Sequence, residues 1–327
     1  MTESTRAKVA RALAARDDRP LARLVAGEAD GLQDLVVDRY GQVARIETSS
    51  AEAARAVDDV CAALVARGID AIVHVTRGAR GKGGVRVLFG DVPSAHVVDE
   101  DGFRFLVRTK DDEALGTGIF VDQRRGRALV RAHALGHPML NLFAHAGGFT
   151  VAAARGGASR VDHVDMSKKC ARWGALNLAL NGVNPRAHRF VVDDAIDFVA
   201  RAARRARDGG ERYRVIVCDP PTTAVRPDGT RMVARDLLAA LAASCLAALD
   251  DQGLLVLSCN DRALTDDDLV DVVLHEDARA HVSPLPFDAD VAPDGARGSV
   301  STRAVVVRRG APLNARGGRA PSRGGSR

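Results

Sequence analysis

The chain has 327 residues, enough for two domains with buried cores. With 46% hydrophobic and 27% charged residues it has a globular composition, and no apolar run approaches the ~18 residues that a membrane helix needs. Its five cysteines form no Cys-x-x-Cys pair, which argues against a disulfide framework and a zinc site. The N-terminus lacks a continuous apolar segment, so we expect a cytoplasmic protein without a metal.

The net charge of +5 is concentrated at the C-terminal end. Six arginines and no acid lie between residues 308 and 327, and without them the first 307 residues carry a charge of −1. Residues 309–327 are rich in glycine and arginine, which predicts a disordered tail. Such a tail can attract phosphates of nucleic acid or serve only as a solubilising end, and composition does not choose between the two.

The first 115 residues predict a short helix over 1–20 and then a small α/β domain over 21–115. The basic, glycine-rich loop at 77–84 is either a solvated turn or a contact for phosphates. Within this domain the patterns predict a hairpin at 35–49, a helix at 51–68, strands at 71–76 and 85–90, and a second hairpin at 96–109.

From residue 116 to residue 308 the pattern changes to a larger α/β domain. A turn and a basic helix come first, and five short apolar strands then alternate with helices. This spacing predicts a mostly parallel, doubly wound sheet with helices on both faces. The five strands are expected near 138–144, 160–165, 188–193, 214–219 and 253–259, with a last pair near 281–286 and 300–308 closing the sheet.

The ends of the first two of these strands carry residues suited to a nucleotide-like ligand. Gly147 and Gly148 follow the first strand, where glycines permit a tight turn and a close approach of backbone to ligand. Asp165 ends the second strand, a position from which a carboxylate accepts hydrogen bonds from ribose hydroxyls. A dehydrogenase would also place an acid there, but its first turn should read G-x-G-x-x-G, which this chain lacks.

The third and fourth strands also end in acids. Asp193 and Asp194 are placed to bind an exocyclic amine such as that of adenine, and the rigid Asp219-Pro220-Pro221 turn is placed beside a reacting group. Each acid alone could be an ordinary helix N-cap. Because acids follow three successive strands, the combination favours a class I S-adenosylmethionine-dependent methyltransferase.

At this point the chain resembles bacterial RNA methyltransferases that act on large-subunit ribosomal RNA. One similar branch is the cytosine-C5 enzymes, whose fifth strand ends in Ser-Cys, and another is the guanine-N7 half of a bifunctional enzyme, which has Asn where Cys259 stands. The resemblance rests on GEADGLQDLVVDRYG (27–41), TGIFVDQR (117–124), NLFAHAGGFTVAAARGGA (141–158), VDMSKKCARWGALNLALNG (164–182), CDPPTT (218–223) and LSCN (257–260).

The resemblance implies S-adenosyl-L-methionine as cofactor and RNA as partner, with residues 21–115 as an RNA-docking domain. It also implies that the TGIFVDQR segment, Asp122 included, lies near the cofactor or the base. The residues expected at the cofactor are Phe120, Gln123, Arg124, Asn141, Ala144, Gly147, Gly148, Phe149, Asp165, Met166, Asp193, Asp194, Asp219 and Pro220.

Cys259 is the candidate nucleophile of the cytosine-C5 reaction. A thiolate that adds to carbon 6 of cytosine makes carbon 5 nucleophilic enough to take the methyl group, and an acid must hold the ring nitrogen. Cys259 at the end of the fifth strand and Asp219 at the end of the fourth would be neighbours in a parallel sheet. We therefore assign them as nucleophile and base-orienting acid.

Three other interpretations stay open at this stage. Cys259 can be a small buried residue that ends an apolar strand, since free cysteines are commonly buried. A second interpretation is that the acceptor of the methyl group is a nitrogen, such as guanine N7, whose methylation needs no thiol. Thr222 stands where exocyclic-amine enzymes usually place an aromatic residue, which disfavours adenine N6. A non-catalytic RNA-binding factor for ribosome assembly is the third possibility.

Overall fold

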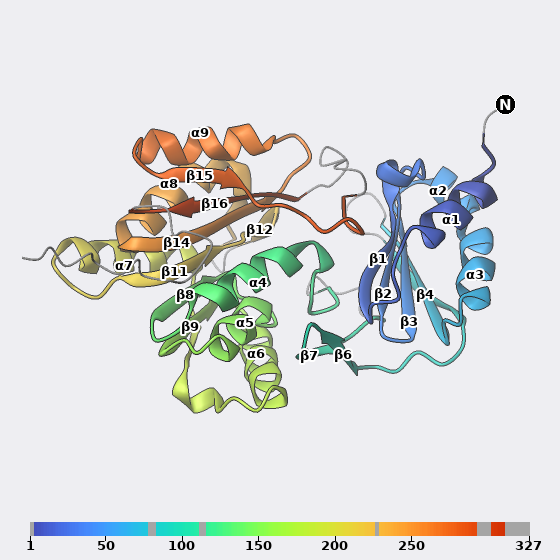
Figure 1. The fold of residues 1–327 in the computed structure, drawn as a ribbon, viewed down its shortest axis with the longest axis horizontal. Coiled ribbons are helices and arrows are strands. Elements are labelled where there is room, and N and C mark those ends of the chain that lie inside the picture. Colours follow the sequence, from blue (N-terminus) through green and yellow to red (C-terminus); the bar gives the residue numbers. More distant parts are fainter. Residues whose placement is uncertain (1–2, 78–82, 111–115, 226–228, 293–301, 311–327) are drawn as a thin grey trace, which may run out of the picture.

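The computed structural model describes residues 3–77, 83–110, 116–225, 229–292 and 302–310. Residues 78–82 of the predicted basic loop and residues 311–327 of the predicted disordered tail lie outside the described residues. Figure 1 shows a smaller N-terminal unit beside a larger unit that contains the remainder of the chain.

The N-terminal unit is a five-stranded sheet with helices packed on one face. Its strand order is β1-β2-β3-β4-β5, antiparallel throughout except for the parallel β3–β4 pair. The predicted hairpin and helix are confirmed, although the helix is divided in two, while β1 was not predicted. The elements are α1 (Thr5–Ala14), β1 (Leu21–Ala26), β2 (Leu35–Tyr40), β3 (Val43–Thr48), α2 (Ala51–Arg55), α3 (Val57–Ala66), β4 (Ala71–Thr76) and β5 (Gly84–Phe89).

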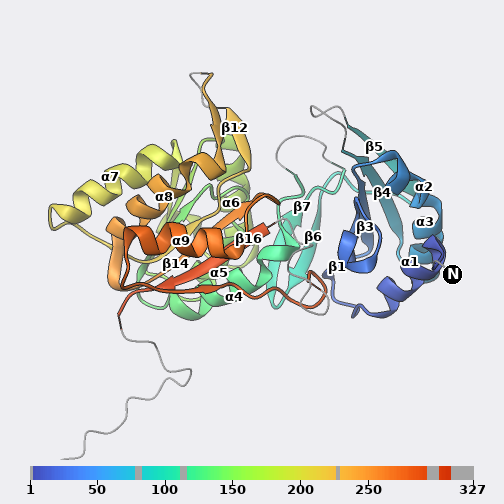
Figure 2. The same ribbon diagram turned by 90° about the horizontal axis from the view of Figure 1, so that it is seen from above.

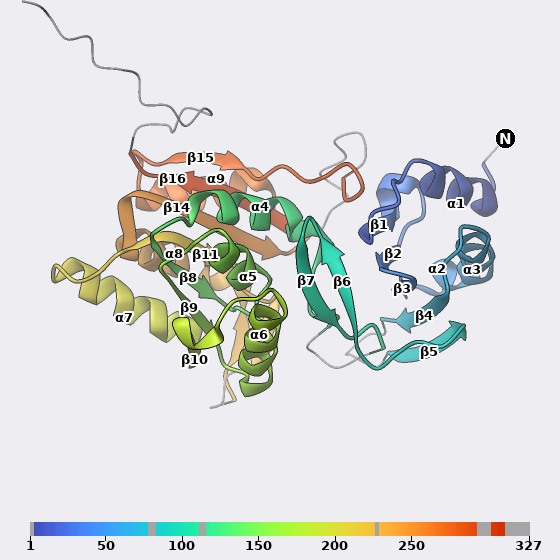
Figure 3. The same cartoon turned by 60° about the horizontal axis from the view of Figure 1, so that its bottom comes forward.

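The second predicted hairpin, β6 (His96–Glu100) with β7 (Phe103–Val107), is confirmed but packs against the larger unit. Its apolar side chains share one core with the larger sheet. Asn177 accepts a hydrogen bond from the backbone of Leu106 at 2.9 Å. Figure 3 shows the hairpin between the two units. We therefore propose that the domain boundary lies before His96, and not at residue 115 as the sequence predicted.

The larger unit confirms the predicted doubly wound α/β fold. Its seven-stranded sheet has the order β10-β9-β8-β11-β14-β16-β15, in which the first five strands are parallel and β16 runs antiparallel between β14 and β15. The strands are β8 (Pro138–Leu142), β9 (Arg160–Asp165), β10 (Arg189–Val192), β11 (Tyr213–Cys218), β14 (Leu249–Asn260), β15 (His281–Pro284) and β16 (Thr302–Arg308).

Helices cover both faces of this sheet, as Figure 1 shows. Helices α4 and α5 pack with one apolar core, and α7, α8 and α9 pack with the other. Strand order reverses between β8 and β11, and open sheets bind ligands outside the carboxyl ends of the strands at this point. The helices are α4 (Arg124–His133), α5 (Gly148–Arg155), α6 (Lys168–Leu180), α7 (Ala195–Arg207), α8 (Ala234–Ala248) and α9 (Asp266–Glu276).

Two short elements lie next to the carboxyl ends of the strands. A 3-10 turn at Val121–Gln123 leads into α4, and a hairpin of β12 (Thr223–Val225) and β13 (Arg231–Val233) follows the Asp219-Pro220-Pro221 turn. Figure 2 shows this hairpin projecting away from the sheet. Among the described residues, no helix combines the length and the apolar character needed to cross a membrane.

Candidate functional site

A cavity of about 690 Å³ opens at the carboxyl ends of β8, β9, β11 and β14. This volume lies within the range of small-molecule sites. Ten of the predicted cofactor residues line it, namely Phe120, Gln123, Asn141, Ala144, Gly148, Phe149, Asp165, Met166, Asp219 and Pro220. Gly147, Arg124, Asp193, Asp194 and Cys259 are not among its lining residues.

The turn after β8 brings backbone to the cavity wall through unusual geometry. Phe143 and His145 adopt the left-handed conformation with φ of 53° and 49°, although neither is glycine. Such strained residues cluster at functional sites. A Cβ atom on Gly148 would lie 2.9 Å from Ile119 Cδ1, and one on Gly147 would lie 3.0 Å from the Gly174 backbone. Gly148 thus lets Ile119 pack closely against the turn, while Gly147 lets α6 pack closely.

Asp165 is held at the end of β9 by two backbone groups. The amide of His145 donates to one carboxylate oxygen at 2.9 Å, and the amide of Ser167 donates to the other at 2.8 Å. These bonds fix the carboxylate on the cavity wall beside Gly148. A carboxylate oriented in this way is suited to accept hydrogen bonds from two ribose hydroxyls.

The two acids after β10 have protein partners. Asp194 is the N-cap of α7 and accepts a hydrogen bond from the Ile196 amide at 2.8 Å. Asp193 forms an ion pair with Arg201. The N-cap alternative considered from the sequence is therefore the role that the structure shows for Asp194, and Ala195 lines the cavity next to it. The expected contact of these acids with adenine stays a prediction.

Asp219 is the acid at the centre of a hydrogen-bonded network. Ser258 on β14 donates to its carboxylate at 2.5 Å, and Gln123 donates to Ser258 at 3.3 Å. Burial raises the pKa of Asp219 to about 6, with a smaller contribution from the charge of Asp122, while the hydrogen bond from Ser258 lowers it. A carboxyl with a pKa of about 6 is mostly ionised at pH 7 and can accept a proton, so it can serve as a general base.

Cys259 faces away from the cavity. Side chains alternate along a strand, so Ser258 and Cys259 point to opposite faces of β14. Cys259 is fully buried in the core that also contains Leu255 and Leu257. Burial and the nearby acids, Asp261 first, raise the pKa of its thiol to about 11. The arrangement therefore matches the buried-core alternative, and the role of Cys259 as nucleophile stays a prediction.

Cys170 also lines the cavity, although the sequence did not mark it as a site residue. It lies on α6, and the Ser167 side chain accepts a hydrogen bond from its amide at 3.2 Å. Burial, followed by the charge of Asp165, raises the pKa of the Cys170 thiol to about 11. A thiol with a raised pKa is a weak nucleophile, which favours a packing role for Cys170 beside Asp165.

Arg124, predicted at the cofactor, serves a structural role. Its guanidinium donates to Asp288 at 2.8 Å, to Asp290 at 3.0 Å and to the Leu21 carbonyl at 2.7 Å. These bonds join the N-terminal unit, α4 and the segment before β16. One turn later Arg127 lines the cavity, pairs with Glu100 at 2.5 Å and donates to the Phe120 carbonyl at 2.9 Å.

Several lining residues were missed from the sequence. Phe143, His145 and Ser258 lie within segments that carry the resemblance but were not singled out, Arg127 lies on α4, and the N-terminal unit contributes Arg77. A period-2 pattern could have identified Ser258, but β14 is apolar on both faces and shows none. Among the missed residues, those that line the cavity include Arg77, Arg127, Phe143, His145 and Thr302. Ser258 is not among the lining residues but donates to Asp219, and the hydroxyl of Thr302 donates to Asp122.

Two features define a class I methyltransferase. One is the strand order, in which β16 runs antiparallel between β14 and β15, and the other is the acid held at the end of β9. The residues present fit S-adenosylmethionine, because Asp165 offers a carboxylate fixed by two backbone amides on the wall of a cavity that Gly148 also lines. This cofactor supplies an electrophilic methyl group. Asp165 would hold the ribose of the cofactor, and the backbone of the Phe143–Gly148 turn would lie next to the cofactor.

Comparisons with known proteins agree with this class. A model of the S-adenosylmethionine-dependent methyltransferase family matches residues 44–294, and the chain belongs to that family. A methyltransferase structure complexed with SAH superposes with a TM-score of 0.79 at 22% identity, covering 94% of this chain and 83% of that one, which shows the shared fold.

Two curated relatives are ribosomal RNA methyltransferases by name. The chain is 39% identical over 175 residues to ribosomal RNA large subunit methyltransferase K/L of Methylococcus capsulatus. It is 34% identical over 218 residues to ribosomal RNA large subunit methyltransferase I of Klebsiella pneumoniae. These alignments cover 53% and 64% of this chain but only 23% and 52% of the relatives.

Proposed function

We propose that this chain transfers a methyl group from S-adenosylmethionine to a nitrogen of a base in large-subunit ribosomal RNA. The RNA class is supported by the two named relatives. The nitrogen acceptor is supported by one observation: the fifth strand presents Ser258 to Asp219, while the thiol of Cys259 lies on the opposite face. A ribosomal substrate places the proposed reaction in the cytoplasm.

Nitrogen methylation needs a polarised base and no covalent adduct. As the new C–N bond forms, the C–S bond breaks and its electron pair stays on sulfur, so the positive charge moves to the base. The Asp219 carboxylate, oriented by Ser258, is placed to stabilise that charge on a ring nitrogen such as guanine N7. With an exocyclic amine as acceptor, the same carboxylate would take the displaced proton.

Cytosine C5 is the second candidate acceptor. It is favoured by the position of Cys259, which immediately precedes the cavity-lining Asn260 near the end of β14, the strand that pairs with the one before Asp219. For this chemistry the fully buried thiol must turn into the cavity and lose its proton. The raised pKa of Cys259 opposes the second of these steps.

The test compares Asp219→Asn with Cys259→Ala in transfer of labelled methyl to large-subunit rRNA, with nucleosides identified by mass spectrometry. We expect Asp219→Asn to lower kcat by roughly 10²–10⁴-fold and Cys259→Ala to keep activity within about twofold. A methylated purine is the expected product.

The other outcomes separate the alternatives. Loss of activity in Cys259→Ala together with 5-methylcytidine in the product would establish the cytosine reaction instead. Absence of methyl transfer to any rRNA by the unaltered chain would leave the non-catalytic RNA-binding role. Asp59→Asn, an exposed substitution on α3, serves as the matched control.

A further inference from the structure

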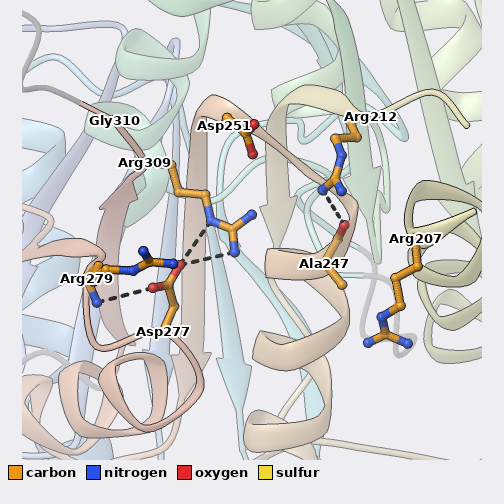
Figure 4. Close-up of a pocket in the computed structure, with 8 residues that line it drawn as sticks. All are labelled: Arg207, Arg212, Ala247, Asp251, Asp277, Arg279, Arg309 and Gly310. Carbon is orange, nitrogen blue, oxygen red and sulfur yellow. Dashed lines mark hydrogen bonds and ion pairs between the residues drawn. The ribbon is translucent and has the colours of Figure 1, made fainter. Parts of the chain in front are cut away.

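A second cavity, of about 440 Å³, lies at the opposite end of the seven-stranded sheet from the methyltransferase site. It is formed where α7 ends, where β14 begins and where β16 ends. Figure 4 shows Arg279 and Arg309 with Asp277 on one side of this arginine cleft and Arg207 and Arg212 on the other. Asp251 completes its charged lining.

Two of the four arginines are anchored by the protein. Arg212 donates to the carbonyls of Ala247 and Leu249 at 2.9 and 3.2 Å, at the end of α8. Arg309 pairs with Asp277 at 3.1 Å and donates to the same Leu249 carbonyl at 3.4 Å. These bonds fix the walls of the cleft and hold two guanidiniums in place.

The other two arginines are uncommitted within the described part of the chain. The guanidiniums of Arg207 and Arg279 form no ion pair or hydrogen bond with a described residue, and both side chains are exposed. With Asp277 paired to Arg309, Asp251 is the remaining carboxylate that faces them. The cleft therefore carries an excess of positive charge with free donors.

The surroundings extend this positive charge. Arg204 and Arg205 accompany Arg207 in the last turn of α7, and Arg308 lines a small neighbouring cavity together with Arg214, which pairs with Asp250 at 3.1 Å. Gly310, which lines the arginine cleft, is followed in the sequence by four further arginines and no acid. A concentration of arginine on one face is the electrostatic signature of a surface that binds nucleic acid.

We propose that the arginine cleft binds phosphates of the RNA backbone at a position remote from the acceptor base. The inference rests on the proposed function, because it takes the RNA substrate as its ligand. Guanidinium groups bind phosphate through paired N–H donors, and Arg207 and Arg279 keep such donors available. The cleft and the methyltransferase cavity lie at opposite ends of strands of about six residues, which places them roughly 20 Å apart. Only an extended RNA therefore contacts both.

The test measures the affinity of the full chain for a fluorescent large-subunit rRNA transcript between 50 and 200 mM KCl, by anisotropy. Each phosphate contact contributes about 0.7 to 0.9 to the slope of log affinity against log salt. We expect Arg207→Gln/Arg279→Gln to reduce that slope by about 1.5 and to weaken binding about tenfold at 100 mM salt.

A matched control removes the same charge elsewhere. Arg6 on α1 and Arg186 on the 3-10 turn before β10 are exposed, without a side-chain partner among the described residues, so Arg6→Gln/Arg186→Gln should leave the slope unchanged. Asp251→Asn removes the free carboxylate of the cleft and should strengthen RNA binding by about two- to threefold.

Three results would overturn the inference: an equal loss of slope in both double variants, no loss in the cleft variant, or no affinity of the unaltered chain for the transcript. Methyl transfer to the same transcript is measured separately. If the unaltered chain methylates RNA while the cleft variant binds normally, only the cleft assignment fails. If it binds through the cleft but transfers no methyl group, only the proposed function fails.

Discussion

The two ends of the seven-stranded sheet differ in the balance of their charged residues. At the carboxyl ends of the strands, Asp165 and Asp219 line the methyltransferase cavity. At the amino ends, Arg207, Arg212 and Arg309 line the arginine cleft. Helix dipoles account for part of this difference, because acids are stabilised where helices begin and cations where they end. Helix α7 follows this rule with an acid as N-cap and arginines in its last turn.

The sign of a charged residue does not by itself identify a ligand site. A site is identified by whether the charged group faces a cavity and by the groups to which it bonds. Asp165 and Asp219 are each oriented by hydrogen bonds and face a cavity. Asp194 lies at the same end of the sheet but bonds to the helix that it caps. At the amino end, Arg212 is held by hydrogen bonds to backbone carbonyls, whereas Arg207 lines the cleft with its donors uncommitted.

The largest expected effect tests which charges at the carboxyl end are structural. Arg124→Ala leaves the buried carboxylates of Asp288 and Asp290 without this partner. Breaking a buried ion pair typically costs about 3–5 kcal/mol, so we expect denaturant unfolding to show a loss of that size. Folded protein should still bind S-adenosylhomocysteine by calorimetry. Normal stability with lost binding would instead place Arg124 at the cofactor, as the sequence predicted.

The next effect concerns an acid that faces the cavity. Asp165→Asn keeps the shape of the side chain but removes the charge that two ribose hydroxyls would contact. Hydrogen bonds to charged groups contribute about 1.5–3 kcal/mol, so we expect the Kd for S-adenosylhomocysteine to rise roughly 10- to 100-fold. Asp59→Asn, an exposed change on α3, is the control. An unchanged Kd would mean that Asp165 only fixes the turn after β8.

The smallest effect separates the two neighbours at the end of β14. The Ser258 hydrogen bond favours ionised Asp219, so Ser258→Ala should raise the pKa of Asp219 further above about 6. If catalysis needs the carboxylate, activity disappears as pH falls through this pKa, and in Ser258→Ala it disappears at a higher pH. We expect a severalfold lower kcat at pH 7. Cys259→Ala should leave the acid limb of the pH–rate profile in place; a shift in both variants would contradict this role of Ser258.

Much of the fold could be predicted because it depends on local patterns. Apolar strands that alternate with helices indicated the doubly wound sheet, and acids at strand ends indicated where its ligand binds. Strand β1 was missed because Arg23 interrupts its apolar run. Arg23 pairs with Asp38 on β2 at 2.9 Å, a compensation that spacing within one strand does not reveal.

By itself, the sequence determined the class of fold, the edge of the sheet that carries the site and ten residues of the cavity lining. Only the tertiary structure decided that Ser258, and not Cys259, faces Asp219, since a strand buried on both faces has no polarity pattern to orient it. It also assigned Arg124 to a partner 166 positions away. Side-chain direction and ion-pair partners depend on contacts between distant segments, which exist only after the chain has folded.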